Sequence, residues 1–104
     1  MVLRGVNIFP IQIEKILMQF TELASNYLIT LTTDDDNDNM TVEVELEDLF
    51  TDDYSRLQTL QKNIQRALKD EILLTPHVKL VPKGSLPVSE GKAVRMIDKR
   101  KVYQ

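Results

Sequence analysis

The stretch YLITLTTDDDNDNMTVEVELED, residues 27–48, contains the clearest strand patterns of the chain. In YLITL, at the start of the stretch, every second residue is expected on the same face. In TVEVELED, at its end, glutamates alternate with apolar residues. The residues expected to point inward are Tyr27, Ile29, Leu31, Val42, Val44 and Leu46. The acids expected on the opposite face are Glu43, Glu45 and Glu47. Because neighbouring side chains of a strand face opposite sides, and TTDDDNDN predicts a loop, we expect an antiparallel hairpin with one buried and one acidic face.

A first helix is predicted ahead of the hairpin by FPIQIEKILMQF, residues 9–20. Pro10 suits the first helical position, where its missing N–H has no intrahelical partner in any case. The apolar residues that recur at helical spacing are Ile13, Ile16, Leu17 and Phe20. Asn7 is expected to be a turn or capping residue, and RGVN a loop that enters the helix.

A second helix is predicted after the hairpin, from about Asp52 to Ile72. Its candidate capping residues are Thr51, Asp52 and Asp53, and its apolar stripe consists of Leu57, Leu60, Ile64, Ala67 and Leu68. HVKLVP, residues 77–82, then predicts a third strand. The sequence therefore predicts one α+β domain over residues 1–104, in which helices pack on one face of a small three-stranded sheet made of the hairpin and the third strand.

Composition limits the possible functions of these 104 residues. The chain has no cysteine, which excludes disulfides, thiolate zinc sites and cysteine nucleophiles. It has neither an apolar run long enough to span a membrane nor the layout of a signal peptide, so we expect a cytoplasmic protein without a membrane partner. Residues 83–104, a Gly/Pro/Ser loop followed by a basic tail, carry six basic and two acidic residues, a net of +4 against −3 for the whole chain.

Three kinds of site are disfavoured by spacing. Asp34, Asp36 and Asp38 have the spacing of the first ligands of a calcium-binding loop, and Glu45 falls at its twelfth position. However, Asn39 stands where such loops need glycine, and the flanking segments are predicted strands instead of helices. We therefore favour an exposed hairpin tip and predict no metal site. His77 is the only histidine and has no nucleophile at a recognisable spacing, which favours a structural role. Nucleic acid is not expected as a partner, because the body is acidic and the tail has a single aromatic residue.

Lys92 follows Gly91 directly in the sequence SEGKAVR, residues 89–95. This is not a phosphate-binding P-loop, because the first glycine is missing and alanine follows the lysine. A lysine beside a flexible glycine is nevertheless suited to bind a phosphate or carboxylate oxygen, and the alternative is a solvated surface lysine.

Two segments together resemble a known family. RGVNIFPIQIEKIL, residues 4–17, and GSLPVSEGKAVRMIDKR, residues 84–100, are similar to the C-terminal domain of phenylacetate-coenzyme A ligases, which are acyl-adenylate-forming enzymes. The resemblance covers nearly the whole chain. It implies a two-step reaction in which an aryl acid and Mg²⁺-ATP form an acyl-adenylate, from which coenzyme A then displaces AMP.

The resemblance also implies roles for single residues. Lys92 would stabilise developing charge during adenylation. Gly91 would give its loop freedom, and Arg4, Gly5 and Asn7 would serve the thioester step after the domain has rotated. An N-terminal adenylation domain of the same enzyme would supply the ATP and acid pockets, so no cofactor is expected to bind tightly to this chain, which should be inactive by itself.

One departure from the family is Val88, where arginine is common, so we expect a supporting charge to be absent there. An alternative that the residues leave open is a free-standing α+β module that binds a small ligand or has a regulatory role, without catalysis. The acidic hairpin face and the absence of a catalytic domain from these residues favour that alternative.

Overall fold

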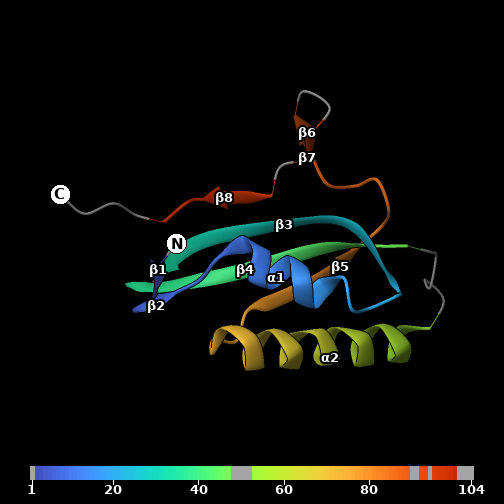
Figure 1. Ribbon diagram of the computed structural model, residues 1–104, viewed down its shortest axis with the longest axis horizontal. Coiled ribbons are helices and arrows are strands. Elements are labelled where there is room, and N and C mark those ends of the chain that lie inside the picture. Colours follow the sequence, from blue (N-terminus) through green and yellow to red (C-terminus); the bar gives the residue numbers. More distant parts are fainter. Residues whose placement is uncertain (1, 48–52, 90–91, 94, 101–104) are drawn as a thin grey trace.

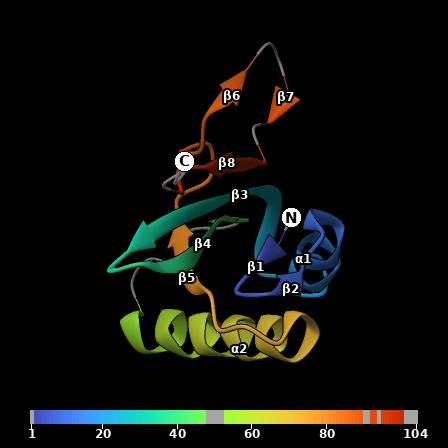
Figure 2. The same ribbon diagram turned by 90° about the vertical axis from the view of Figure 1, so that its left-hand side faces the viewer.

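The computed structural model describes residues 2–47, 53–89, 92–93 and 95–100. A twisted sheet forms the middle of the molecule; the longer helix lies below it, the shorter helix lies at one side, and a small separate hairpin projects above it (Figure 1; Figure 2). The helices are α1 (Pro10–Leu17) and α2 (Tyr54–Ile72). The strands are β1 (Val2–Leu3), β2 (Val6–Asn7), β3 (Leu23–Asp34), β4 (Asn37–Leu46), β5 (His77–Val81), β6 (Val88–Ser89), β7 (Lys92–Ala93) and β8 (Met96–Asp98).

The α+β prediction is confirmed, and so is the antiparallel hairpin at its centre. Strands β3 and β4 pair with Ile29 opposite Val42 and Leu31 opposite Met40. The predicted loop between them was too long, because the turn contains only Asp35 and Asp36. Both residues have positive φ, 49° and 65°, a conformation that aspartate tolerates and that two-residue hairpin turns require.

The central sheet has four strands rather than the predicted three, in the order β5-β4-β3-β8. Strand β5 runs parallel to β4, and β8 runs parallel to β3. The amide of Ile29 donates to the carbonyl of Arg95 at 2.8 Å, and the amide of Lys99 donates to that of Leu31 at 2.7 Å. A strand of three residues inside a basic segment shows no alternation in its sequence, so the prediction counted these residues as tail.

Both helices contribute to one apolar core beneath the sheet, as predicted. Ile13, Ile16 and Leu17 of α1 are buried with Leu60, Ile64 and Leu68 of α2. The inward residues of the hairpin are buried in the same cluster: Tyr27, Ile29, Leu31, Val42, Val44 and Leu46. Burial of such side chains is the main stabilising contribution of the fold.

The ends of the helices follow from local hydrogen bonds. Pro10 begins α1 as predicted, but the residue before the helix is Phe9, whose amide donates to the side chain of Gln12 at 2.8 Å. Asn7 therefore does not cap α1 and lies in β2 instead. The carboxylate of Asp53 accepts the amide of Arg56 at 3.2 Å and caps α2, while the predicted caps Thr51 and Asp52 lie outside the described residues.

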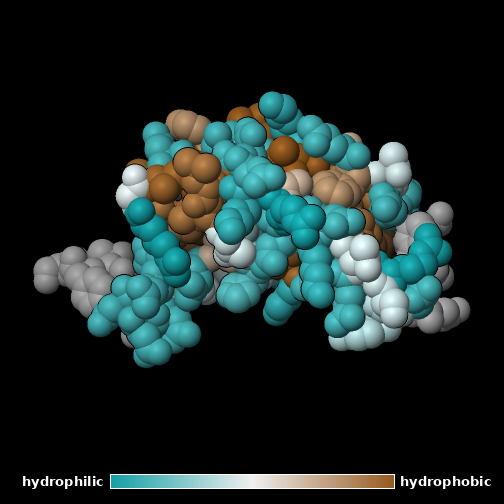
Figure 3. Space-filling view, turned by 90° about the horizontal axis from the view of Figure 1, so that it is seen from below, coloured by the Kyte–Doolittle hydropathy of each residue, from teal (hydrophilic) through white to brown (hydrophobic). Residues whose placement is uncertain are grey.

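The lower face of the molecule, where α2 lies, is mostly hydrophilic, with hydrophobic patches toward one end and along the upper edge of the view (Figure 3). Gln61 and Gln65 of α2 donate to the main-chain oxygens of Val78 in β5 and of Pro76 just before it, so the helix also satisfies acceptors at the start of this strand. Among the described residues, neither helix has the length and hydropathy needed to cross a bilayer.

Candidate functional site

The predicted lysine lies on the small hairpin that projects from the sheet. Val88 pairs with Ala93, and Ser89 with Lys92, so the main chain of Lys92 lies in β7. Gly91 lies outside the described residues. In both ribbon views this hairpin stands away from the four-stranded sheet (Figure 1; Figure 2). The hairpin therefore presents the lysine main chain on an extension of the domain rather than within its core.

Glu45 holds the chain just before this hairpin. One carboxylate oxygen of Glu45 accepts the amide of Gly84 at 2.9 Å, and the other accepts the amide of Leu86 at 3.0 Å and the side-chain amide of Asn26 at 2.9 Å. The prediction that Glu45 belongs to an exposed acidic face was wrong, because residues 84–86 cover it and leave it only 4% exposed.

The charged form of Glu45 is favoured in spite of its burial. Burial by itself would raise the pKa of the carboxyl group, but the hydrogen bonds from the Gly84 and Leu86 amides, together with that from Asn26, outweigh it. The pKa of Glu45 therefore lies below its ordinary value, and Glu45 is a carboxylate at neutral pH.

Arg95 holds the chain just after the hairpin. Its guanidinium donates to the side-chain oxygen of Asn26 at 3.1 Å and to the carbonyl of Ser25 at 3.3 Å. It also lies 4.6 Å from the centre of the Tyr27 ring, a cation–π contact. Burial raises the pKa of Tyr27, so the ring beneath Arg95 is neutral.

The second predicted site, Arg4, Gly5 and Asn7, forms a tight turn between β1 and β2. Val2 pairs with Asn7, and the turn residues Arg4 and Gly5 have φ values of 50° and 78°. Glycine adopts a positive φ without the steric cost that a Cβ brings, which accounts for Gly5 at 78°. The Arg4 side chain donates to the carbonyl of Asp38 at 2.8 Å and to the side chain of Asn39 at 3.0 Å, so the turn rests on the tip of the β3–β4 hairpin.

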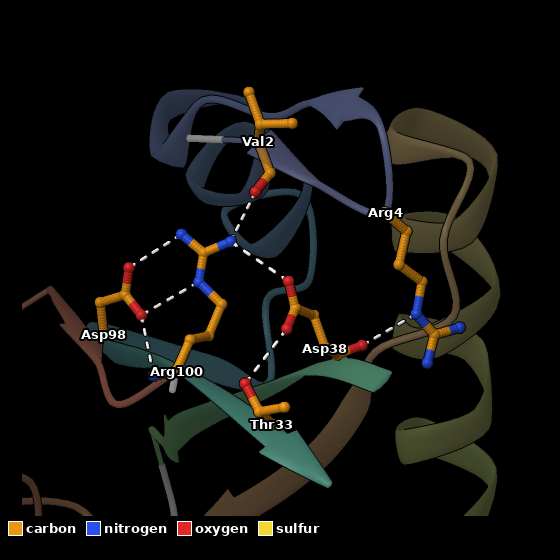
Figure 4. A network of polar contacts seen from close by, with 6 residues as sticks. All are labelled: Val2, Arg4, Thr33, Asp38, Asp98 and Arg100. Carbon is orange, nitrogen blue, oxygen red and sulfur yellow. Dashed lines mark hydrogen bonds and ion pairs between the residues drawn. The ribbon is translucent and has the colours of Figure 1, made fainter. Parts of the chain in front are cut away.

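Arg100 fastens the same turn from the other side (Figure 4). Its guanidinium donates to the Asp98 carboxylate at 3.0 and 2.8 Å and to the Val2 carbonyl at 2.6 Å, and it lies 3.5 Å from a carboxylate oxygen of Asp38. The hydrogen bonds from Arg100 lower the pKa of Asp98 to about 2. The network thus ties β1, β8 and the β3–β4 hairpin together.

The two predicted sites occupy separate parts of the domain. The β1–β2 turn and the β6–β7 hairpin lie apart in both ribbon views (Figure 1; Figure 2). The structure does not unite Lys92 with Arg4, Gly5 and Asn7 in one pocket. Each site is therefore a surface that a second body would have to complete.

The described residues form open grooves and no metal centre of their own. One open groove of about 320 Å³ lies between α2 and the segment at Phe20 and Glu22, and another of about 350 Å³ lies between α2 and β5. Among the described residues no group of three His, Cys, Asp or Glu side chains gathers closely enough to hold a metal ion. His77 is exposed at the start of β5.

Sequence reasoning missed the residues that support the two sites. Glu45 looks like any other acid of an alternating strand, because its partners Gly84 and Leu86 lie about forty positions away. Arg95 and Arg100 fall in the quoted basic segment, but nothing local pairs them with Asn26 or Val2. Only the fold brings these groups together.

Comparison with known families gives a match over nearly the whole chain. Residues 5–100 match the family described as AMP-binding enzyme C-terminal domain. The phenylacetate-coenzyme A ligase of Thermus thermophilus is 31% identical over 115 residues, which cover 97% of this chain and 26% of that enzyme. The chain thus spans about a quarter of the length of the curated relatives it matches. These matches confirm the resemblance that the two motifs indicated.

Solved structures agree in fold. A crystallised domain of phenylacetate-coenzyme A ligase from Bacteroides vulgatus is 66% identical with a TM-score of 0.90, over 99% of this chain and 94% of that one. A 2-hydroxyisobutyryl-CoA ligase in complex with 2-HIB-AMP and CoA, in the thioesterification state, is 26% identical with a TM-score of 0.84, over 96% of this chain and 21% of that one.

Proposed function

Because the chain belongs to the family of AMP-binding enzyme C-terminal domains, we propose that it is the mobile C-terminal domain of a cytoplasmic, AMP-forming aryl-acid coenzyme A ligase, with phenylacetate as the default acid. The relatives named phenylacetate-coenzyme A ligase support the choice of reaction. A domain of such a ligase, nearly equal in length to this chain, supports the choice of domain.

The observation that carries the proposal is the placement of two open sites on one compact domain. The lysine hairpin and the β1–β2 turn lie apart (Figure 2), and the hollow that Arg4 lines beside the turn is small, about 20 Å³. A domain that serves two half reactions in two orientations needs such an arrangement, because each orientation presents a different surface to the reacting groups.

In the first half reaction, a carboxylate oxygen of the acid attacks the α-phosphorus of ATP, and pyrophosphate leaves. Negative charge grows on the phosphate oxygens in the transition state. We assign the stabilisation of that charge to the Lys92 ammonium group, and we assign to Gly91 the conformational freedom of the loop that carries the lysine. Neutralisation by a fixed cation in a closed site commonly contributes about 3 kcal/mol.

In the second half reaction, the coenzyme A sulfur attacks the acyl carbon, the bond to AMP breaks, and the thiol proton is released. We assign the surface around Arg4, Gly5 and Asn7 to this step. The turn is well suited to face a ligand, since Arg4 and Arg100 fasten it to the sheet and Gly5 leaves its main chain uncovered.

The preceding adenylation domain of the same enzyme is the partner that completes both sites. ATP with its Mg²⁺, the aryl acid and coenzyme A would bind mainly there, and the acid would be selected there.

The test uses the complete ligase and separates the half reactions. Lys92→Ala should slow acid-dependent ATP–pyrophosphate exchange by about a hundredfold or more, and leave thioester formation from supplied acyl-adenylate within about twofold. Lys62→Ala, which removes an exposed lysine of α2, is the matched control and should change neither rate.

Equal loss of both half reactions, or of neither, would contradict the role of Lys92. The free-standing binding module makes the opposite prediction for the isolated chain. Titration calorimetry with phenylacetate, ATP and coenzyme A should give no binding tighter than about 1 mM if the chain is a ligase domain. Micromolar binding of any of them would favour the module instead.

A further inference from the structure

We propose that Glu45 is a positioning residue for the adenylation step, because its buried carboxylate fastens both ends of the hairpin that carries Lys92. This inference rests on the proposed function of Lys92 and adds a residue to it. Glu45 lies in β4, far along the chain from the hairpin; it binds Gly84 and Leu86 ahead of the hairpin directly, and Arg95 after the hairpin only through Asn26.

The near end of the hairpin is held directly. Gly84 and Leu86 donate their main-chain amides to the two different oxygens of Glu45, so the carboxylate fixes the orientation of the turn as well as its position. The hairpin begins two residues later, at Val88. Leu86 is itself buried, which excludes water from these hydrogen bonds and strengthens them.

The far end is held through Asn26. The side-chain nitrogen of Asn26 donates to Glu45, and the side-chain oxygen of Asn26 accepts from Arg95. Arg95 leads directly into β8, the edge strand of the sheet. The series of hydrogen bonds from Glu45 through Asn26 to Arg95 therefore links the chain that enters the β6–β7 hairpin to the chain that leaves it, and we call this series the clamp.

Only a carboxylate fits this position. All three partners of Glu45 are donors, from the Gly84 and Leu86 amides and from Asn26. A glutamine would replace one accepting oxygen by an NH₂ group and would confront at least one of these donors with another donor. Glu45→Gln thus keeps the size of the side chain and removes the clamp.

Kinetics of the complete ligase test the effect on Lys92. Because small misplacement of a reacting group is costly, Glu45→Gln should slow acid-dependent ATP–pyrophosphate exchange by at least about tenfold. Thioester formation from supplied acyl-adenylate should stay within about twofold. In a Lys92→Ala background Glu45→Gln should slow exchange less than about twofold further, since there is then no ammonium to position.

Glu47→Gln is the matched control. It removes a half-exposed carboxylate two residues further along the chain, just beyond the end of β4, which pairs with Lys83 at 2.7 Å rather than with the amides of Gly84 and Leu86. It should leave both half reactions within about twofold. A defect that Glu45→Gln shares with Glu47→Gln would mean a general effect of charge near the turn, and would overturn the proposal.

Hydrogen exchange of the 104-residue chain tests the clamp without reference to catalysis. In wild type the Gly84 and Leu86 amides should exchange slowly; in Glu45→Gln they should exchange at least about tenfold faster, while the Leu31 amide in the core strand keeps its rate. Unchanged protection of Gly84 and Leu86 would overturn the clamp.

The two proposals can fail separately. If Lys92→Ala blocks exchange and Glu45→Gln does not, the ligase assignment stands and the positioning role is wrong. If neither variant affects exchange although the amides lose protection, the role of Lys92 is wrong, and the catalytic part of this inference is overturned with it.

Discussion

Arg100→Ala should loosen the β1–β2 turn, because Arg100 is the side chain that joins Val2 to the sheet (Figure 4). The variant removes a two-pronged hydrogen bond to Asp98, a hydrogen bond to the Val2 carbonyl and a longer ion pair with Asp38. The side chain of Arg100 is 23% exposed, whereas that of Asp98 is 45% exposed, so solvent screens the contact with Asp98 most strongly.

The expected loss follows from these contacts. Exposed ion pairs typically contribute about 0.2 to 1 kcal/mol, and a hydrogen bond to a charged group contributes about 1.5 kcal/mol or more when it is shielded from water. We therefore expect Arg100→Ala to lower the free energy of unfolding by about 1 to 2 kcal/mol. Arg100→Lys keeps the charge but not the planar fork, and should lose about half as much.

Urea unfolding of the isolated chain measures this loss. The midpoint should fall by about 0.5 to 1 M with an unchanged slope. Lys99→Ala is the matched control, because the hydrogen bond that Lys99 makes to Leu31 comes from its main chain. Equal midpoints for Arg100→Ala and Lys99→Ala would refute the reasoning.

The pH dependence of the Arg100→Ala difference has a definite sign. Asp98 has its pKa lowered from 3.8 to about 2 by Arg100, so its contribution to stability is complete above about pH 4 and disappears as the pH falls toward 2. The difference between wild type and Arg100→Ala should be constant from pH 7 to about pH 4. Below about pH 4 the difference in stability between the two proteins should decrease but not reach zero, because the hydrogen bond from Arg100 to the Val2 carbonyl does not depend on the ionisation of Asp98.

Three further predictions concern the rest of the fold and are checked by urea unfolding. Ile64→Ala should cost about 2 to 5 kcal/mol, because the side chain is fully buried between helices and sheet; a cost under about 1 kcal/mol would contradict that packing. Asp53→Ala should cost about 1 kcal/mol through loss of the cap on the Arg56 amide, whereas Asp70→Ala, an exposed acid of the same helix, should cost less than about 0.5. Gly5→Ala should cost about 1 kcal/mol although its added Cβ meets no atom within 4 Å, because φ is +78°; a neutral or stabilising effect would show that the turn can relax.

The parts of the fold that the sequence predicted are those with a local cause. Ile13, Ile16 and Leu17 recur at helical spacing, and Val42, Val44 and Leu46 alternate, so burial of one face follows from covalent geometry alone. Pro10 and Asp53 marked helix starts because their effects reach only a few residues. These features need no knowledge of distant contacts.

The parts that were missed depend on distant contacts. Glu45 and Glu47 have the same local pattern, yet one is covered by the turn at Gly84 and the other is half exposed beside Lys83. Strand β8 owes its existence to the free edge of β3, which its own three residues do not reveal. The site residues Arg4, Gly5, Asn7, Gly91 and Lys92 came from the family resemblance, and their roles remain predictions.

The connection between the two sites has a mechanical consequence for the proposed rotation. Arg95 closes the lysine hairpin, the next three residues form β8 along β3, and Arg100 then holds Val2 beside the second turn. One short stretch of chain, hydrogen-bonded to the long central strand, therefore spans from one site to the other. Under the proposed function, a rotation that exchanges the two surfaces at an active site would move both as a single body, and the change in backbone conformation would fall outside the stretch from Arg95 to Arg100 that joins them.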